Sequence, residues 1–456
     1  MYVKNLFSVA FVLILTYTAI SQSSQNITLL DRWENNTLVP STDHNNTYNE
    51  TWGFVQDGVE YGVIGTTWGT HIFDLANPTS IVEVVSIKGE HFGADIIHRD
   101  YHDYNGYLYI VSDEGQGIST LKIVDLQYLP DSVSIVYNED SLFSTSHNIF
   151  IDTAKAKLYT CGGNNNFGVR AFSLTNPIVP EEISSLSLPS SAHDIFVRND
   201  TAYINDGTSG LRIYNFSDAA NPILIDSLFD YPQKGYNHSG WLNEDGSIYV
   251  LADETHGTDL KILDVSDLSN ITLLDTISSQ IDHQYSIPHN VMVKGDNVFV
   301  SYYFDGLVIY NISDPSNPYI SGYYDTSTET HANWVYRGCW GVYSFLPSGI
   351  VLASDMQNGL YVLDVTNATG ISNNEDNSFN VIVFPNPASE SVIISTKDYK
   401  NASYQIVNIN GQMVKSGNLL NSIETIQLNA IPNGTYLIEI SAENNKTITK
   451  KLVKSN

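Results

Sequence analysis

The hydrophobic positions of this chain come in short β-rich runs that recur in pairs. In each pair, a run of four or five residues leads through a turn, often with glycine, to a second run; Tyr107–Val111 and Leu121–Asp125 form one such pair. Runs of this length, rich in β-branched and aromatic residues and bounded by turn residues, predict strands. Seven pairs occur between Gly62 and Asp364, which predicts an all-β repeat protein.

A further apolar run precedes each pair and opens on a dipeptide that recurs every 42 to 53 residues. The seven dipeptides are Trp52-Gly53, Ala94-Asp95, His147-Asn148, His193-Asp194, His238-Ser239, His289-Asn290 and Trp340-Gly341. After many pairs, Asn-Pro or Asp-Pro leads into a fourth short run. Proline is tolerated at the start of an edge strand because its missing N–H removes no hydrogen bond that the sheet needs. Four strands per repeat of this length predict a seven-bladed β-propeller.

The seventh repeat lacks a fourth run, and the N-terminal part of the chain has one to supply. Asn26–Asp31 is identical in sequence to Asn270–Asp275, the fourth run of the fifth repeat. We therefore expect residues 27–33 to complete the last blade and to fasten it to the first. A ring closed in this way leaves only short strand edges exposed.

The two ends of the chain predict export and a second domain. Leu6–Ile20 is an apolar run behind Lys4, too short for a comfortable membrane span, and predicts a signal peptide over residues 1–21. The propeller is then expected over 22–368 and an acidic, Asn/Ser-rich linker over 369–380.

Residues 381–456 have a different pattern. Alternating runs such as Thr435–Ile440, together with the hairpin dipeptide Asn410-Gly411, predict a small antiparallel β-sandwich. Its motifs are Phe384–Pro387, Ile409–Gln412, Leu428, Ile431–Tyr436 and Lys450–Lys454. With these motifs the segment resembles the type A C-terminal sorting domain of the type IX secretion system. The resemblance implies export across an outer membrane by that machinery, with the tail removed or used for anchoring, and hence a secreted or surface-attached protein.

The repeats also resemble a known family. The residues that carry this resemblance are Trp52–Phe54, Glu60-Tyr61, Ser146–Ile149, His193-Asp194, His238–Leu242, Asp253-Glu254, His289-Asn290, Gly338–Tyr343 and Leu346–Gly349. They are similar to the LVIVD-repeat, "choice-of-anchor B" family of propellers. Where the second blade of that family tends to open with Trp-Arg-Asp, this chain has Gly93-Ala94-Asp95. The resemblance implies a propeller joined to varied export and anchor signals, and it brings no established activity.

Charge and cysteine content narrow the function classes. The chain has 50 Asp and Glu against 21 Lys and Arg, a net charge of −29. Such a chain repels phosphate backbones and anionic membranes, so we do not expect it to bind nucleic acid. Cys161 and Cys339 are far apart in repeat order, which favours two buried free thiols, although export permits a disulfide.

Histidines at the openings of consecutive inner runs are the candidate site. In a propeller blade, the start of the inner strand lies beside the end of the second strand, so these histidines should form an arc around the central channel. Residues of the second-strand ends, including Asp113-Glu114 and Asp355, should join the same rim. The candidate ligands of a divalent metal are His147, His193, His238, His289, Asp194 and Asp253. The alternative is that these side chains hold turns and buried backbone groups.

The remaining motifs leave three functions open. No nucleophile elbow, phosphate loop or Cys-x-x-Cys occurs, so serine-hydrolase, nucleotide and thiol-redox activities have no support. Trp52 and Trp340 open two inner runs and are expected to pack in the core in a shared register. The pattern favours a binding module with a protein or glycan partner over an enzyme. A metal-dependent hydrolase and a structural surface component are the alternatives.

Overall fold

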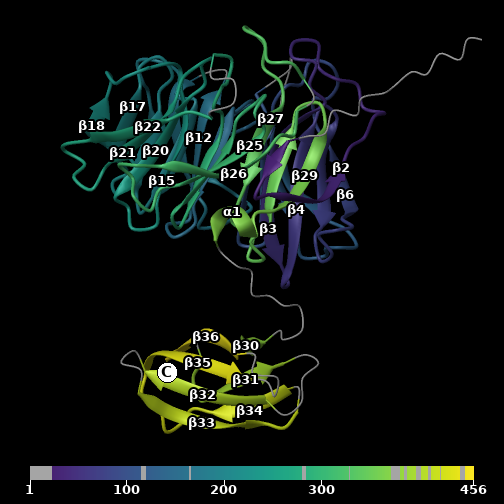
Figure 1. The fold of residues 1–456 in the computed structure, drawn as a ribbon, viewed down its shortest axis with the longest axis vertical. Coiled ribbons are helices and arrows are strands. Elements are labelled where there is room, and N and C mark those ends of the chain that lie inside the picture. The colour runs from purple at the N-terminus through teal and green to yellow at the C-terminus, as the bar shows by residue number, and fades with distance from the viewer. Residues whose placement is uncertain are drawn as a thin grey trace, which may run out of the picture. The chain divides into compact units, whose positions relative to one another are not determined.

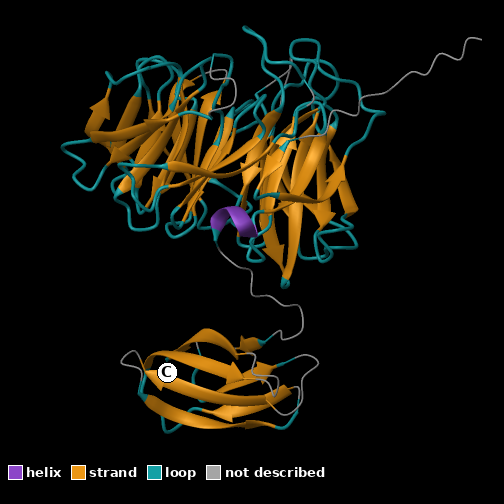
Figure 2. Cartoon of the chain, viewed as in Figure 1, coloured by secondary structure: helices purple, strands orange, loops and turns teal. Residues whose placement is uncertain are grey.

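The computed structural model describes residues 23–113, 120–163, 166–279, 284–327, 329–370, 381–384, 388–396, 402–408, 412–421, 423–441 and 447–455. The chain divides into two compact units, residues 1–372 (unit 1) and 373–456 (unit 2). Figure 2 shows that the described structure is almost entirely β-strand, with the single short helix α1 (Thr366–Thr369). No described helix has the length and hydrophobicity of a membrane span. The predicted signal peptide, Glu114, most of the linker and Asn410-Gly411 lie outside the described residues.

The described residues of unit 1 form seven antiparallel sheets (Figure 1). In chain order, the first four sheets are β3 (Tyr48–Gln56), β4 (Val59–Thr66), β5 (Gly69–Asp74) and β6 (Val82–Lys88); β7 (Asp100–Tyr104), β8 (Tyr107–Val111), β9 (Leu121–Asp125) and β10 (Ser134–Glu139); β11 (Asn148–Asp152), β12 (Lys157–Gly163), β13 (Asn166–Ser173) and β14 (Glu181–Leu186); and β15 (Asp194–Arg198), β16 (Thr201–Asn205), β17 (Leu211–Asn215) and β18 (Ile223–Leu228).

The other three sheets of unit 1 have the same strand order. They are β19 (Asn237–Leu242), β20 (Ile248–Asp253), β21 (Leu260–Asp264) and β22 (Thr272–Ile277); β23 (Val291–Lys294), β24 (Asn297–Ser301), β25 (Leu307–Asn311) and β26 (Tyr319–Tyr324), with β1 (Ser24–Gln25) outside β26; and β27 (Cys339–Tyr343), β28 (Val351–Asp355), β29 (Gly359–Asp364) and β2 (Thr28–Trp33). The first strands of successive sheets contact one another from β3 through to β27, and β27 contacts β3.

β2 is the strand of the last sheet that comes from the other end of the chain. It runs antiparallel to β29, from the pair Thr28 and Asp364 to the pair Trp33 and Leu360, and Figure 1 shows the two strands side by side. The indole of Trp33 then reaches β5 of the first sheet, with its ring centroid 4.9 Å from that of Phe73. The N-terminal strand therefore links the last sheet to the first.

Turn chemistry explains why the third strands end on Asp or Asn. Six of the seven end on such a residue, whose side chain accepts the backbone N–H two positions further on, and the remaining one ends on Ser173, which does the same. The six are Asp74, Asp125, Asn215, Asp264, Asn311 and Asp364. These Asx-type turns stop each strand and direct the chain into the outer strand.

The second repeat differs from the sequence pattern. Its inner strand begins at Asp100, six residues after the predicted opening at Ala94. Gly93 has a φ of 113°, and the carbonyl of Ala94 accepts the N–H of Thr42. The predicted opening is therefore a loop bonded to the segment before β3, and the strand starts later.

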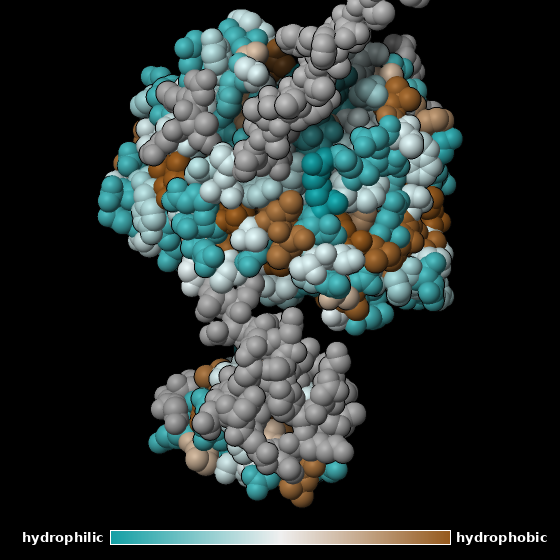
Figure 3. All heavy atoms as spheres, turned by 45° about the vertical axis from the view of Figure 1, so that its right-hand side comes forward, coloured by the Kyte–Doolittle hydropathy of each residue, from teal (hydrophilic) through white to brown (hydrophobic). Residues whose placement is uncertain are grey.

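The surface of unit 1 mixes polar and apolar side chains. Several outer strands expose hydrophobic residues, among them Val82, Ile135, Ile223 and Tyr319. Figure 3 shows hydrophobic and hydrophilic residues interspersed over the face of unit 1 in view. Scattered apolar residues of this kind are normal for a folded protein and identify no partner surface by themselves.

Unit 2 has two antiparallel sheets in its described part. They are β30 (Ile382–Phe384), β31 (Ser391–Ser395) and β34 (Ile423–Gln427), and β33 (Met413–Leu419), β32 (Ala402–Asn408), β35 (Gly434–Ser441) and β36 (Thr447–Lys454). Ile394 of one sheet and Ile406 and Ile438 of the other are buried in one hydrophobic cluster. Alternation along the strands thus provides each sheet with one apolar face.

Candidate functional site

Five histidines from five consecutive sheets lie side by side in unit 1. The centroids of neighbouring imidazoles are 4.2, 4.2, 4.0 and 4.3 Å apart. Trp340 of the next sheet completes the circuit, at 4.8 Å from His289 and 5.7 Å from His98. We call this set the histidine ring, and its members are His98, His147, His193, His238, His289 and Trp340.

The backbone at the start of each inner strand places these side chains. The N–H of His193 donates to the carbonyl of Asn205 at the end of β16, and the N–H of His289 donates to Ser301 at the end of β24. The prediction that the start of the inner strand lies beside the end of the second strand is confirmed here, since Asp194 pairs with Asn205.

The side chains after the histidines form two further layers. Strand alternation directs every second residue of an inner strand to the same face. The first layer has one residue from each inner strand or, for Asn290, from the position just before it: Glu50, Asp100, Asn148, Asp194, Ser239, Asn290 and Gly341. We call its three carboxyl residues, Glu50, Asp100 and Asp194, the acidic layer. They line a cavity of about 10 Å³ together with His98, His147, His193, His238 and His289.

Aromatic side chains form the next layer, most of them two residues further along the inner strands. Ring centroids link Trp52 to His102 at 4.7 Å, His102 to Phe150 at 5.3 Å and Phe150 to Trp241 at 5.8 Å. Phe345 and Tyr343 continue the circuit back to Trp52, with centroids 5.3, 5.9 and 4.8 Å apart. We call Trp52, His102, Phe150, Trp241, Phe345 and Tyr343 the aromatic layer. Because the acidic residues line cavities shared with both aromatic sets, the acidic layer lies between them.

The expectation that Trp52 and Trp340 share a register is wrong. Trp340 lies with the histidines, whereas Trp52 lies in the aromatic layer. The residue of β27 that corresponds to Trp52 is Tyr343, because Gly341 stands opposite Glu50 in the layer above. An added Cβ at Gly341 would lie 2.0 Å from Oε1 of Glu50.

The predicted metal ligands are only partly brought together. The four predicted histidines are all members of the histidine ring, and Asp194 lies in the layer below. Asp253 is directed elsewhere: it is fully buried, pairs with the ammonium of Lys261 at 2.7 Å and accepts the phenol of Tyr231 at 2.8 Å.

Three residues at the ring had a weaker sequence signal. Arg99 separates His98 from Asp100, whereas each of the other four histidines directly precedes its residue of the next layer, so the dipeptide pattern missed His98. Asp113 and Glu254 stand at second-strand ends beside the ring, as the rim argument predicts. Oδ2 of Asp113 is 2.6 Å from Nδ1 of His147, and Oε2 of Glu254 is 3.9 Å from Nε2 of His238.

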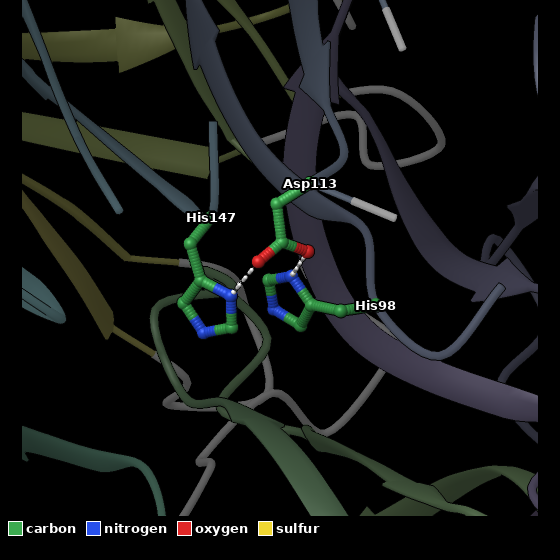
Figure 4. A group of neighbouring side chains, drawn as sticks. All are labelled: His98, Asp113 and His147. Atoms are coloured by element: carbon green, nitrogen blue, oxygen red, sulfur yellow. Dashed lines mark hydrogen bonds and ion pairs between the residues drawn. The ribbon is translucent and has the colours of Figure 1, made fainter. Parts of the chain in front are cut away.

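Two groups of three side chains have the composition of a metal site. In the first, shown in Figure 4, the carboxylate of Asp113 directs one oxygen toward the imidazole of His98 and the other toward that of His147. The second consists of His193, His238 and Glu254. In each group, one ligand atom from every residue lies within 4.8 Å of the other two. Zinc holds nitrogen and oxygen ligands at about 2.0–2.2 Å, so either group must close by roughly 1 Å to hold it.

Burial and mutual charge set the protonation of the ring. Burial, assisted by the charge of neighbouring imidazoles, holds the pKa of His98, His193 and His238 well below the usual value. Burial also lowers the pKa of His289 to about 3. Burial acts in the same direction on His147, but the charge and hydrogen bond of Asp113 overcome it and raise the pKa of His147 to about 9. The ring at neutral pH therefore has one imidazolium, paired with Asp113, and four neutral imidazoles.

Several of these buried polar atoms have no hydrogen bond. Among the described residues, Nδ1 of His98, His193 and His238 and Oδ1 of Asp113 lack a hydrogen-bond partner. Nδ1 of His289, in contrast, lies 2.6 Å from the carbonyl of Trp340. Unsatisfied buried polar atoms are rare in folded proteins and are explained by water, an ion or a ligand.

The carboxyl groups of the acidic layer, next to the histidine ring, also have shifted pKa values. Burial raises the pKa of Asp100 and Asp194 to about 7 and the pKa of Glu50 well above its usual value. Each carboxyl is held by the backbone N–H of the next residue, at 2.8 to 2.9 Å. Clusters of perturbed titratable groups around a central cavity mark functional sites more often than structural ones.

Comparisons with known proteins agree with both units. A model described as "Secretion system C-terminal sorting domain" matches residues 382–455, and a model described as "LVIVD repeat" matches residues 189–230, 251–278 and 288–326. The choice-of-anchor B resemblance stays a prediction. No curated protein is significantly similar in sequence to this chain.

Solved structures support a propeller fold. The chain is similar to the β-propeller domain of Cps50 (Swd1) from Myceliophteria thermophila, with a TM-score of 0.50, 12% identity and coverage of 74% of this chain and 98% of that one. It is also similar to U3-55K, with a TM-score of 0.51, 10% identity and coverage of 74% and 98%.

PorZ, a surface component of the type-IX secretion system of Porphyromonas gingivalis, is a weaker neighbour. The TM-score is 0.47 at 10% identity, the match covers 92% of this chain, and the chain spans 61% of the length of PorZ. The chain thus carries LVIVD repeats in an all-β, propeller-like unit and ends in a type IX secretion sorting tail, which indicates secretion or attachment to the cell surface.

Proposed function

We propose that unit 1 is a seven-bladed β-propeller, closed by β2, that acts as a binding module outside the cell. Seven sheets of one strand order, contacts between successive inner strands and the pairing of β2 with β29 support this architecture. In this proposal, residues 1–21 are removed as a signal peptide, 22–368 are the propeller, 369–380 are a linker and 381–456 form the domain that engages the type IX machinery.

The binding face in this proposal is the one that carries the histidine ring. The observation that supports it is the set of neutral, buried imidazoles whose Nδ1 atoms lack partners. Of the two candidate groups, His193, His238 and Glu254 are the better ligands for a divalent metal, because His147 of the other group is already paired with Asp113. Glu254 takes the place predicted for Asp253 and Asp194.

Zinc fits this group by ligand type. Imidazole nitrogen and carboxylate oxygen are common zinc ligands, and three protein ligands leave a fourth position open. A group from a protein or glycan partner can occupy that position, which joins the metal site to the binding role. The carboxylate of Glu254 accepts a hydrogen bond of 2.6 Å from the phenol of Tyr303, as metal-ligating carboxylates usually do from a neighbouring donor.

A metal-dependent hydrolase is the second candidate. The open fourth position of a three-ligand zinc site is also where such enzymes hold the attacking water. The phenol of Tyr303 beside Glu254 is the observation that favours this candidate, since it places a proton donor next to the site. Turnover of ester or peptide substrates by the zinc-loaded chain, lost in a Glu254→Gln variant, distinguishes it from simple binding.

Metal content of the purified full chain tests the proposal. We expect stoichiometric zinc by mass spectrometry after zinc addition and desalting, and loss of it in the double variant His193→Ala, His238→Ala. The double variant His44→Ala, His91→Ala, which changes two histidines outside the ring, is the matched control and should retain the metal. A chain that holds no metal, or a double variant that retains it, would overturn the site.

A further inference from the structure

The cavity between the acidic layer and the aromatic layer is a second site, distinct from the histidine ring. Its volume is about 50 Å³, and Glu50, Asp100 and Asp194 line it together with Trp52, Phe150 and Trp241. We infer that this cavity binds the ammonium group of a small primary amine. The inference uses the same scaffold as the proposed function but needs no metal.

The aromatic walls suit a cation that is attached to an alkyl chain. Trp52 is 9% exposed, while Phe150 and Trp241 are half-buried, so the cavity has a wall that reaches the surface. The electron-rich faces of indole and phenyl rings attract a desolvated cation. Methylene groups next to the ammonium can then remain against Trp241 and Phe150, where apolar contact is favourable.

The carboxyl groups provide the charge complement. None of the ion pairs among the described residues includes Glu50, Asp100 or Asp194. Asp194 accepts the N–H of Ile195 through Oδ1, and in the described part of the chain its Oδ2 makes no hydrogen bond. The imidazolium of His147, whose charge acts on Asp100 and Asp194, is already paired with Asp113 at 2.6 Å. Glu50 accepts hydrogen bonds from Thr51 and Asn290, and Asp100 accepts them from Tyr101 and Ile149. Buried carboxylates without an ion-pair partner are costly, and a bound cation relieves that cost.

Hydrogen bonding selects a primary ammonium among possible cations. Its three N–H donors match the carboxylate and amide oxygens of the cavity, and charge-assisted hydrogen bonds of this kind are about twice as strong as neutral ones. A quaternary ammonium has no N–H to donate. A metal ion would need oxygen ligands on all sides, whereas Trp52, Phe150 and Trp241 also line this cavity.

Calorimetric titration of the full chain in EDTA tests this inference. The probes are n-butylammonium, tetramethylammonium, n-butanol and potassium ion. We expect saturable binding of n-butylammonium only. The result that would overturn the site is equal binding of n-butanol, equal competition by potassium or tetramethylammonium, or no binding of n-butylammonium.

Substitutions give the second part of the test. Asp194→Asn retains a carbonyl oxygen for the N–H of Ile195 and removes the charge, so it should weaken n-butylammonium by at least about tenfold. Asp226→Asn is the matched control, because Asp226 on outer strand β18 caps the N–H of Ser227 in the same way, at 2.8 Å. It should bind as the unmodified chain does.

The amine site and the metal site can fail separately. Glu254→Gln should reduce zinc binding and leave n-butylammonium binding unchanged, because Glu254 does not line the aromatic cavity. If Asp194→Asn binds n-butylammonium as tightly as the unmodified chain, the amine site is refuted while the zinc result stands by itself.

Discussion

The phenol of Tyr303 donates a hydrogen bond of 2.6 Å to Oε1 of Glu254, across two neighbouring sheets of unit 1. The other carboxylate oxygen of Glu254 lies 3.9 Å from Nε2 of His238. Tyr303 of one sheet thus orients the carboxylate of Glu254 from the neighbouring sheet, next to the imidazole of His238. Outer hydrogen bonds of this kind tune ligand geometry at metal sites.

Tyr303→Phe should weaken zinc binding by roughly 10- to 100-fold, because Glu254 loses the bond that orients it. The aromatic ring is retained, so the melting temperature in EDTA should change little. Competition titration with a coloured zinc chelator measures the affinity. Unchanged zinc affinity in Tyr303→Phe would remove Glu254 from the ligand set.

Trp33→Ala should destabilise unit 1 by about 2 kcal/mol. The indole of Trp33 belongs to β2 of the last sheet, yet its ring packs at 4.9 Å against Phe73 of the first, so the substitution weakens the link between the two. Trp334→Ala is the control, since Trp334 is 85% exposed. Urea unfolding by tryptophan fluorescence reports unit 1, which contains all six tryptophans. Equal stability of the two variants would count against a fastening role for β2.

The unfolding free energy of the Asp355→Asn variant should increase, relative to that of the unmodified chain, as pH rises. Burial raises the pKa of Asp355 to about 6, while Gln357, Thr326 and Asn358 donate hydrogen bonds to it. A carboxyl whose pKa is higher in the folded state contributes stability that is complete near pH 4 and is lost as pH rises through 6. The difference in unfolding free energy between variant and unmodified chain should therefore shift by roughly 1–3 kcal/mol between pH 4 and pH 7.5. A difference independent of pH would contradict the raised pKa.

Cys161 and Cys339 should both react as free thiols, and only after unfolding. Both are buried and unpaired, and burial raises the pKa of each thiol well above its usual value. Iodoacetamide should thus modify neither residue in the native chain and both in denaturant without reductant. Mass spectrometry that finds a disulfide in the unreduced protein would contradict this prediction.

The repeat pattern allowed much of the fold to be predicted from the sequence. Strand alternation, turn residues and the period of the repeats predicted the sheets, and the match of Asn26–Asp31 to Asn270–Asp275 pointed to the strand that pairs with β29. The second repeat was misplaced because its loop bonds to Thr42, a contact over 52 positions that no local pattern contains.

For the candidate site, the sequence predicted which backbone positions lie close together, but not the partners of each side chain. His147, His193, His238 and His289 precede or open inner strands, so their proximity follows from the repeat. Side-chain partners do not follow from it: the ion pair of Asp253 with Lys261 depends on a third strand of the same sheet. The acidic and aromatic layers were present in the sequence as residues two apart, such as Glu50 and Trp52, and alternation along inner strands is the signal that finds them.

Anomalous diffraction at the zinc absorption edge, from crystals of the full chain soaked in zinc, tests the central claim most directly. We predict one strong peak between His193, His238 and Glu254, with ligand atoms drawn in to about 2.0–2.2 Å from it. The absence of any anomalous peak at the histidine ring in zinc-soaked crystals, with only water beside the imidazoles, would contradict the account.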